Sequence, residues 1–500
     1  MLKPSPLFTD GAVLCRGKEI RIFGEADEGT EVTAVLTDRN GVPLAEGRGQ
    51  GRNGRFLARL CPQEAQTGCR LTLTDGRERF IAENIAVGEV FLAGGQSNME
   101  LELRNADEGP ELIPVHSDPQ LRFFNVPRCA FGDAGDTGFE QARWQAVVPG
   151  GGGSNSAAAY FFAAALRKRL GDVPVGIIGC YWGGTSVTCW LDRETLRTST
   201  EGTRYLEEYA ERTAGKTLEA YLQEEASFTA GMDRWNAQVE AYRQAHPGAA
   251  WKEISAACGP APWCPPEGPG SPYRPGGLAK TMLEKVVPAT LTGILYYQGE
   301  EDTEKTDRYD ELMLLLIRRW RSLFRDAELP FLFVQLPMYI DFDAEDSFRW
   351  PAIRRAQAAA RDAARNTGMV CLLDQGEYGN IHPTAKRPVG ERLAGLAGAM
   401  LYGGGEVSPR ALDKSTRDGT LTVRLSAPVT VRGGGEAALL EAAGEDGAFR
   451  PAKAEVLGDR LVLKAEGVKN PVRARYAWTD YSDRVNLFGE NGLPLEPFDL

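Results

Sequence analysis

Four groups capable of acyl-transfer chemistry each follow a stretch that is typical of a β-strand: Ser97, Gly184, Gln298 and His382. A serine attacks a carbonyl when a base takes its proton, and N–H groups stabilise the resulting oxyanion. Ligands of open α/β sheets bind outside the carboxyl ends of the strands, where all four residues are expected. Taken singly, each also fits an ordinary turn or helix start. Together they predict a serine nucleophile, two oxyanion donors and a histidine base.

Histidine is scarce enough to narrow the choice of base. The chain has three, His116, His246 and His382, and none shows the HExxH spacing of a metal site. His116 lies in a proline-containing loop and His246 precedes Pro247-Gly248, so we expect both to be solvated. His382 comes just before a predicted helix, where a base for Ser97 is needed. No metal or organic cofactor is required by this chemistry.

The elements that must position these residues alternate between strands and helices. This rhythm predicts an α/β fold with a mainly parallel sheet. The expected strands are 87–93, 173–179, 291–297, 331–336 and 369–373, and the expected helices are 154–170, 306–324, 351–365 and 384–401.

The texture differs on both sides of this region and within it. Residues 1–86 show short strands of period two and predict an N-terminal β-sandwich, whereas residues 405–500 predict a C-terminal β-domain. The catalytic domain is expected at 87–404, with a helical insertion at about 197–285 that contains a Pro/Gly run. From its placement, we expect the insertion to shape the entrance of the site.

Composition excludes several classes of partner. A net charge of -12 and a pI near 5.1 disfavour binding to nucleic acid or to an anionic membrane. The sequence has no uninterrupted apolar stretch of a membrane span and no recognisable signal peptide. Nine cysteines without a CxxC motif favour free thiols, and we therefore expect a cytoplasmic protein. The oligomeric state stays open.

Short sequence blocks around these candidates resemble a known family. The blocks are Gly95-Gln96-Ser97-Asn98-Met99-Glu100, Trp182-Gly183-Gly184-Thr185, Tyr297-Gln298-Gly299-Glu300 and Ile381-His382-Pro383. They are similar to the four blocks of the sialate O-acetylesterase family within the SGNH hydrolases. Further likeness at 8–17, 333–337, 472–478 and 492–498 extends the resemblance over nearly the whole chain.

The resemblance implies a three-layer parallel-sheet domain and a carbohydrate O-acetylesterase. Sialic acid is the leading acceptor, with acetylated xylan and other glycans as alternatives. Carried over by position, Ser97 is the nucleophile that forms an acetyl-enzyme and His382 is the general base. The backbone N–H groups of Ser97 and Gly184 and the side chain of Gln298 are the implied oxyanion donors.

One position departs from the family pattern and leaves the third catalytic residue open. Many SGNH enzymes carry an Asp three residues before the His, but this chain has Gly379 there. Asp374, or after it Glu377, is expected to reach the imidazole Nδ1; alternatively, a backbone carbonyl orients the ring and a Ser–His dyad operates.

Other functions are weighed against this one. The missing Asp supports a non-catalytic glycan-binding protein on a degenerate hydrolase scaffold. Residues 150–154 suggest a nucleotide site but lack the Gly-Lys-Ser/Thr that cradles phosphates. If sialic acid is the substrate, its carboxylate calls for an arginine, and Arg104, Arg354 and Arg355 are the candidates, although each also fits a solvated charge.

Overall fold

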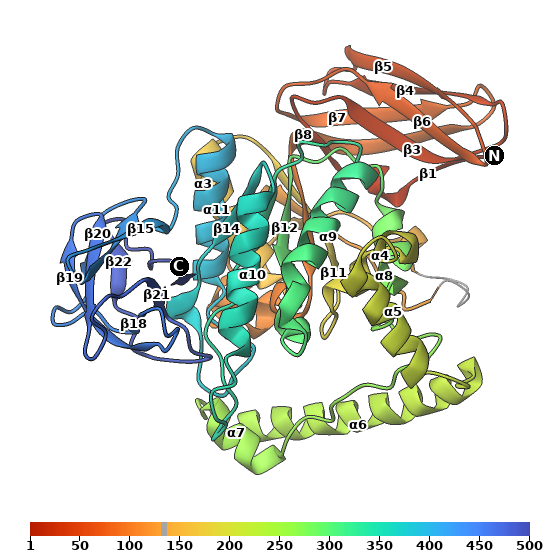
Figure 1. The fold of residues 1–500 in the computed structure, drawn as a ribbon. Coiled ribbons are helices and arrows are strands. Elements are labelled where there is room, and N and C mark those ends of the chain that lie inside the picture. The colour runs from red at the N-terminus through yellow and green to blue at the C-terminus, as the bar shows by residue number, and fades with distance from the viewer. Residues whose placement is uncertain (132–137) are drawn as a thin grey trace.

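A computed structural model describes residues 1–131 and 138–500, and its centre is a mainly parallel sheet (Figure 1). The strand order is β10-β9-β11-β8-β12-β13-β14, and only β10 runs antiparallel to its neighbour. The bounds are β8 (Arg79–Gly95), β9 (Asp118–Asn125), β10 (Gln145–Val147), β11 (Val175–Tyr181), β12 (Gly293–Tyr297), β13 (Phe331–Val334) and β14 (Thr367–Val370). The central strands are almost entirely buried, as expected for a parallel sheet covered by helices.

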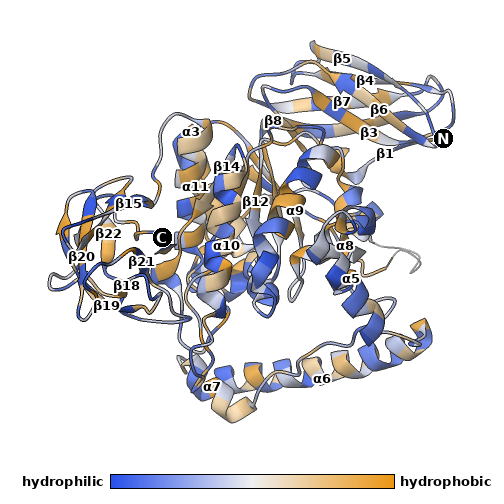
Figure 2. Cartoon of the chain, in the orientation of Figure 1, coloured by the Kyte–Doolittle hydropathy of each residue, from blue (hydrophilic) through white to orange (hydrophobic). Residues whose placement is uncertain are grey.

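Two pairs of long helices accompany this sheet. Helix α3 (Ala157–Leu170) packs on α11 (Arg387–Leu401), and α9 (Tyr309–Leu323) packs on α10 (Arg349–Ala363). Gly390 allows the first pair to approach closely, because a Cβ there would lie 2.3 Å from the backbone nitrogen of Phe162. In Figure 2 the central strands are predominantly orange, which marks the hydrophobic core between the helices. The predicted mixed α/β fold is therefore confirmed.

The N-terminal region forms two β-sheets. One contains β1 (Leu2–Pro4), β3 (Ile20–Ala26) and β6 (Arg55–Leu60); the other contains β4 (Glu31–Thr37), β5 (Pro43–Gln50), β7 (Gln66–Thr74), the first half of β8, and β2 (Val13–Cys15). In β4, alternate side chains are buried, as its period of two predicts.

Strand β8 connects the N-terminal sheets with the central sheet. Its beginning pairs with β7, with Phe80 opposite Leu73, and its end pairs with β11 and β12 through Phe91. The boundary predicted between 86 and 87 falls within this strand, so the N-terminal strands and the central sheet are continuous at β8. The division into domains remains a prediction.

The insertion is helical, and its middle part lies on the opposite side of the molecule from the N-terminal sheets (Figure 1). It contains α5 (Thr200–Arg212), α6 (Leu218–Ala245) and α7 (Trp251–Cys258), with the shorter α4 (Arg193–Leu196) and α8 (Gly277–Thr281) at its ends. Within α6, only Tyr221 and Val239 are buried. Because β8 enters the central sheet from the N-terminal side, its carboxyl end points toward α6.

The C-terminal region is a β-rich domain, as predicted. Its larger sheet has the order β15-β16-β20-β19-β18-β21-β23, and β17 pairs with β22. The bounds are β15 (Ala411–Arg417), β16 (Thr420–Leu425), β17 (Val429–Val431), β18 (Leu440–Ala443), β19 (Arg450–Leu457), β20 (Arg460–Ala465), β21 (Arg473–Tyr476), β22 (Leu487–Gly489) and β23 (Phe498–Asp499). The buried Arg354 of α10 donates to the carbonyls of Ala477 and Thr479 and so joins this domain to the central one.

Strands β9 and β10 were not predicted from the sequence. The apolar residues of β9, Leu121, Phe123 and Phe124, are few and are interrupted by Arg122; they follow Asp118-Pro119, a pair that is more typical of turns. Across the described residues, none of the helices has the length and apolar character needed to cross a bilayer.

Candidate active site

Ser97 and His382 meet at the carboxyl edge of the central sheet. Ser97 begins the short helix α1 (Ser97–Glu100), directly after β8, and His382 lies in the loop between β14 and α11. The distance between Ser97 Oγ and His382 Nε2 is 2.8 Å, although 285 positions separate the residues. The turn before Ser97 requires glycine, because Gly95 has φ +132° and a Cβ there would lie 2.1 Å from the carbonyl oxygen of Tyr297. This contact gives the serine a base within hydrogen-bonding distance.

The loop that carries His382 is braced by its own polar groups. The backbone N–H of His382 donates to Asn380 Oδ1 at 3.0 Å. Asn380 Nδ2 in turn donates to Glu377 Oε2 at 2.7 Å, and Thr384 N donates to the other oxygen of Glu377 at 3.3 Å. Glu377 therefore stabilises the loop.

The imidazole is set to remain neutral. The enclosing protein atoms and, after them, the positive charge of Lys386 lower the pKa of His382 to about 4, although part of the residue is exposed. A neutral ring accepts a proton, so His382 is ready to act as a base near neutral pH.

The structure does not bring a predicted acid to this ring. Both oxygens of Asp374 accept from Arg392, at 2.7 Å each, and Asp374 also accepts from Gln375. Burial acts to raise the pKa of Asp374, but Arg392 holds it below its usual value. Asp374 is carried toward α11 by the 3-10 turn η8 (Leu373–Gln375), which corrects its prediction as the third member. Within residues 1–131 and 138–500, neither Asp374 nor Glu377 bonds to His382 Nδ1, and the geometry is that of a Ser–His dyad.

A buried polar network lies behind the dyad. Lys386 is fully buried, and its ammonium donates to Asn98 Oδ1 at 2.6 Å. Asn98 Nδ2 donates to Glu300 Oε1 at 2.6 Å and to the carbonyl of Ile381 at 2.9 Å. Because Asn98 follows Ser97 and Ile381 precedes His382, this one amide side chain connects the Ser97 turn to the His382 loop.

Burial shifts the pKa values of two charged groups in this network in opposite directions. It lowers the pKa of Lys386 to about 7, and it raises the pKa of the Glu300 carboxyl. Glu300 Oε2 has no hydrogen-bond partner in the described chain. The Lys386 ammonium also lies 5.5 Å from the centre of the Tyr297 ring.

Two backbone N–H groups beside Ser97 have no protein acceptor within the described residues, those of Ser97 and Gly184. Gly183 lies between them in space, since a Cβ on it would be 3.3 Å from Ser97 Cβ. Its own N–H is already bound to Glu100 Oε2 at 2.6 Å. The Gly184 backbone has φ +71°, which favours glycine. Within the part of the chain that is described, these two amides have free N–H groups, the kind of donor that stabilises an oxyanion.

The contacts of Gln298 differ from those expected of an oxyanion donor. Its amide nitrogen donates to Gln96 Oε1 (3.1 Å), to the Thr185 carbonyl (3.1 Å) and to Asp302 Oδ2 (2.5 Å). Its amide oxygen accepts from Tyr309 at 2.8 Å. An amide nitrogen has two hydrogens, and both are engaged here. The geometry corrects Gln298 from an oxyanion donor to a residue that connects the turn before Ser97 to the loop of Gly184.

Asp302 extends this second network. It accepts from the N–H of Val187 at 2.9 Å and from Tyr205 of α5 at 2.6 Å, in addition to Gln298. Burial raises the pKa of Asp302, while these three donors act in the opposite direction. The carboxyl thereby ties the insertion to the loop that follows Gly184.

Several of these residues were not predicted from the sequence: Asn98, Lys386 and Asp302. Lys386 lies four residues after His382 in the same loop, but its burial has no signature in the sequence. Asp302 belongs to an acidic cluster, 300–302, that is typical of a helix start.

The other histidines lie elsewhere. His116 Nδ1 bonds to the Tyr160 hydroxyl, and His246 stacks on Tyr242 at the end of α6. Within the described residues, no group of three or more His, Cys, Asp or Glu side chains could hold a metal ion.

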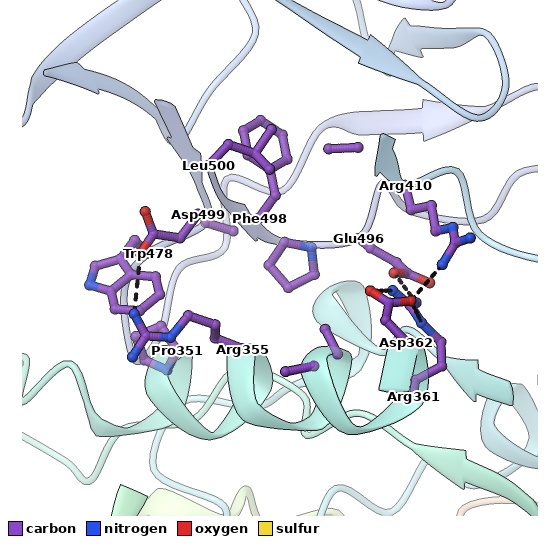
Figure 3. Close-up of a pocket in the computed structure, with 15 residues that line it drawn as sticks. Pro351, Arg355, Arg361, Asp362, Arg410, Trp478, Glu496, Phe498, Asp499 and Leu500 are labelled. Atoms are coloured by element: carbon purple, nitrogen blue, oxygen red, sulfur yellow. Dashed lines mark hydrogen bonds and ion pairs between the residues drawn. The ribbon is translucent and has the colours of Figure 1, made fainter. Parts of the chain in front are cut away.

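A separate cavity of about 220 Å³ lies between α10 and the C-terminal domain (Figure 3). Its charged walls are paired: Arg355 with Asp499, Arg361 with Glu496, and Arg410 with Asp362. Neither Ser97 nor His382 lines it.

The arginines considered for a substrate carboxylate are engaged in other contacts. Arg354 is buried against carbonyl oxygens and Arg355 lies in the separate cavity. Arg104 pairs with Glu102 at 2.8 Å on the surface. The structure gives none of the three a contact with the dyad.

Comparisons with known proteins point in one direction. Residues 275–397 match the family model described as carbohydrate esterase, sialic acid-specific acetylesterase. The chain is 25% identical to the sialate O-acetylesterase of Rattus norvegicus over 83% of this chain and 78% of that protein. It is 26% identical to that of Mus musculus over 64% of this chain and 58% of that protein. The crystal structure of a carbohydrate acetylesterase from Xanthomonas citri superposes with a TM-score of 0.76 at 27% identity, covering 100% of this chain and 99% of that one.

Proposed function

We propose that this chain is a serine esterase that removes O-acetyl groups from sugars, because residues 275–397 match the model of the sialic acid-specific acetylesterase family. The resemblance predicted from the sequence blocks is thereby confirmed. The observation that carries the proposal is the 2.8 Å contact between Ser97 Oγ and His382 Nε2.

In the proposed reaction, His382 Nε2 takes the Ser97 proton while Oγ bonds to the acetyl carbon. The carbonyl electrons move to its oxygen, which the N–H groups of Ser97 and Gly184 stabilise. When the carbonyl reforms, the bond to the sugar oxygen breaks and that oxygen receives the proton from His382. Water, activated by His382, then releases acetate and restores the Ser97 hydroxyl.

The dyad uses no acid to orient the imidazole. Its ring is held through its backbone, by Asn380, Ile381 and the amide of Asn98. This arrangement supports the dyad alternative and weakens the glycan-binding alternative, since a degenerate site has no need of an aligned Ser–His pair.

The acceptor sugar has two candidates. Sialic acid is the leading one, because the rat and mouse relatives are named sialate O-acetylesterases. Acetylated xylan or another neutral glycan is the second, and it is favoured by the engagement of Arg104, Arg354 and Arg355 away from the dyad. The SGNH three-layer arrangement is part of the proposal and is supported by the two separate helix pairs beside the central sheet. The cytoplasmic location remains a prediction.

The test is hydrolysis of p-nitrophenyl acetate and its abolition by a serine-directed fluorophosphonate. We expect the label on Ser97 and acetate release from acetylated sugars. Absence of both hydrolysis and labelling in a folded sample contradicts the proposal. A panel of O-acetylated sialic acids and acetylated xylo-oligosaccharides then distinguishes the two acceptors.

A further inference from the structure

Trp263 is an unusual side chain within the insertion. It is 58% exposed, and its indole lies against Gly184, where a Cβ would be 2.6 Å from Trp263 Cη2. Other large apolar side chains exposed in the described chain, such as Phe348, have no such contact with the predicted oxyanion loop. Exposure of a large aromatic ring beside a candidate active site is typical of a ligand contact.

A second ring supports the indole. Tyr273 lies edge-to-face with Trp263, with 6.4 Å between ring centres and 76° between planes. Tyr273 Cε1 also lies 3.2 Å from the position of a Cβ on Gly184. The two aromatic residues therefore cover one side of the glycine loop, while Ser97 lies beside Gly183.

The segment that carries Trp263 is held at both ends. Before it, Trp235 of α6 donates to the carbonyl of Gly259 at 3.0 Å. After it, the Tyr209 hydroxyl of α5 donates to the Gly268 carbonyl at 2.9 Å and accepts from its N–H at 3.0 Å. Preorganised aromatic groups lose little conformational entropy when they bind a ligand.

The whole insertion is connected to both sides of the dyad. On one side, Tyr205 bonds to Asp302 next to the Gln298 network. On the other, the Lys252 ammonium of α7 lies 5.9 Å from the centre of the Phe342 ring, and Phe342 packs on Gly379 of the His382 loop. Figure 1 shows α6 spanning between these attachments. The aromatic pair is therefore placed by the fold and not by a free loop.

From these contacts we propose that Trp263, supported by Tyr273, is the stacking platform for the pyranose ring of the acetylated sugar. The proposal rests on the function proposed above and deepens it. The C–H face of a pyranose is apolar and packs on an indole face, while its hydroxyls remain toward water. Trp263 contacts Gly184, and Ser97 lies beside the neighbouring Gly183. An acetyl group on a sugar that stacks on the indole therefore has only these two glycines to pass before it reaches Ser97.

The experiment compares two esters in two variants. Trp263→Ala is expected to lower kcat/KM on an acetylated sugar about tenfold or more, mainly through KM, and to change hydrolysis of ethyl acetate less than about threefold. The sugar substrate is whichever of O-acetylated sialic acid and acetylated xylo-oligosaccharide the wild-type protein hydrolyses faster. Trp263→Phe keeps a ring and is expected to retain part of the activity. Phe348→Ala removes another exposed ring and is the matched control, with no expected effect.

Binding is measured separately from catalysis. Saturation-transfer NMR with the deacetylated sugar is expected to show contacts with Ser97→Ala and to lose them when Trp263→Ala is added. Equal losses on both esters mean that the ring only shields the oxyanion site, and this overturns the platform. Unchanged kinetics on both esters also overturn it. If the wild-type protein cleaves neither ester but its sugar contacts depend on Trp263, the esterase assignment fails and the platform stands.

Discussion

The carboxyl edge of the central sheet and the cavity beside α10 differ in how their polar groups are used. In the cavity of Figure 3, each of the three arginines and three acidic side chains that line it lies in an ion pair, for example Arg355 with Asp499. At the carboxyl edge, the N–H groups of Ser97 and Gly184 have no protein acceptor among the described residues. A paired charge is already stabilised and has little to give to a reacting group, whereas an open donor has its full capacity left.

The same contrast appears within the site itself. The outer layer, Ser97 and His382, is partly exposed and joined by one contact, while the inner layer around Gln298 is fully buried and fully bonded. In the proposed reaction the outer layer performs the chemistry, and the inner layer holds it in place. Variants of each layer should therefore fail in different ways.

The largest effect is expected from the outer layer. Ser97→Ala removes the nucleophile and should lower turnover by about 10³-fold or more, leaving the free energy of unfolding within about 1 kcal/mol. Acetate release measures the first quantity and denaturant unfolding the second. Wild-type turnover in this variant would refute Ser97 as the nucleophile.

The inner layer should respond in stability. Gln298→Ala removes one hydrogen bond each from Asp302, the Thr185 carbonyl and the Tyr309 hydroxyl inside a buried network, and we expect the free energy of unfolding to fall by about 2–4 kcal/mol. Turnover of the folded protein should fall about tenfold or less, because the oxyanion donors remain. Urea denaturation and kcat are the measurements. A loss of about 10²–10³ in kcat with unchanged stability would instead restore Gln298 as a direct oxyanion donor.

The pH dependence of kcat/KM should depend on Lys386, which lies between the two layers. His382 acts as a base only when neutral, so kcat/KM is expected to rise through its pKa of about 4 and to level off above it. Lys386, with a pKa of about 7, is charged at the acidic pH values at which His382 gains its proton. Lys386→Met removes this charge, so the pKa of His382 should rise and kcat/KM near pH 5 should fall up to about tenfold. The pH profile of kcat/KM is the measurement.

A second variant separates this electrostatic effect from simple loss of packing. Lys386→Arg keeps the positive charge and should retain the acid limb of the profile even if overall activity falls. The groups that face the Lys386 ammonium are Asn98, Glu300, Glu377, Asp107 and the Tyr297 ring. Superimposable profiles for wild type and Lys386→Met would show that this charge does not act on His382.

The sequence predicts the dyad better than it predicts what supports it. Ser97 and His382 lie at ends of strands that periodicity and turn residues reveal, so their meeting follows from the topology of a parallel sheet. Asp374 also follows a strand, but its choice of partner depends on Arg392 of α11, a contact that spacing along the chain does not encode.

The sequence did not predict the buried polar networks or the strand β9. The networks depend on contacts between segments that lie far apart along the chain. The engagement of Gln298 depends on three acceptors from separate segments, and a single polar residue at a strand end fits a donor or a structural hub equally well. Domain boundaries are similarly hidden, because β8 continues from the N-terminal sheets into the central sheet as one uninterrupted strand.

The smallest effect is expected in the cavity. Arg355→Ala removes an exposed guanidinium that pairs with the buried Asp499 and lies 5.2 Å from the centre of the Trp478 ring. Because Arg473 also pairs with Asp499, the change should cost about 1 kcal/mol of stability or less. Because this arginine lines a cavity that contains neither Ser97 nor His382, kcat/KM on an O-acetylated sialic acid should change less than about twofold. The variant thus tests whether paired charges away from the dyad take any part in recognition. A selective rise in KM for the sialic acid, absent with an acetylated xylo-oligosaccharide, would mean that the cavity binds the substrate carboxylate and that the contrast between the two regions is false.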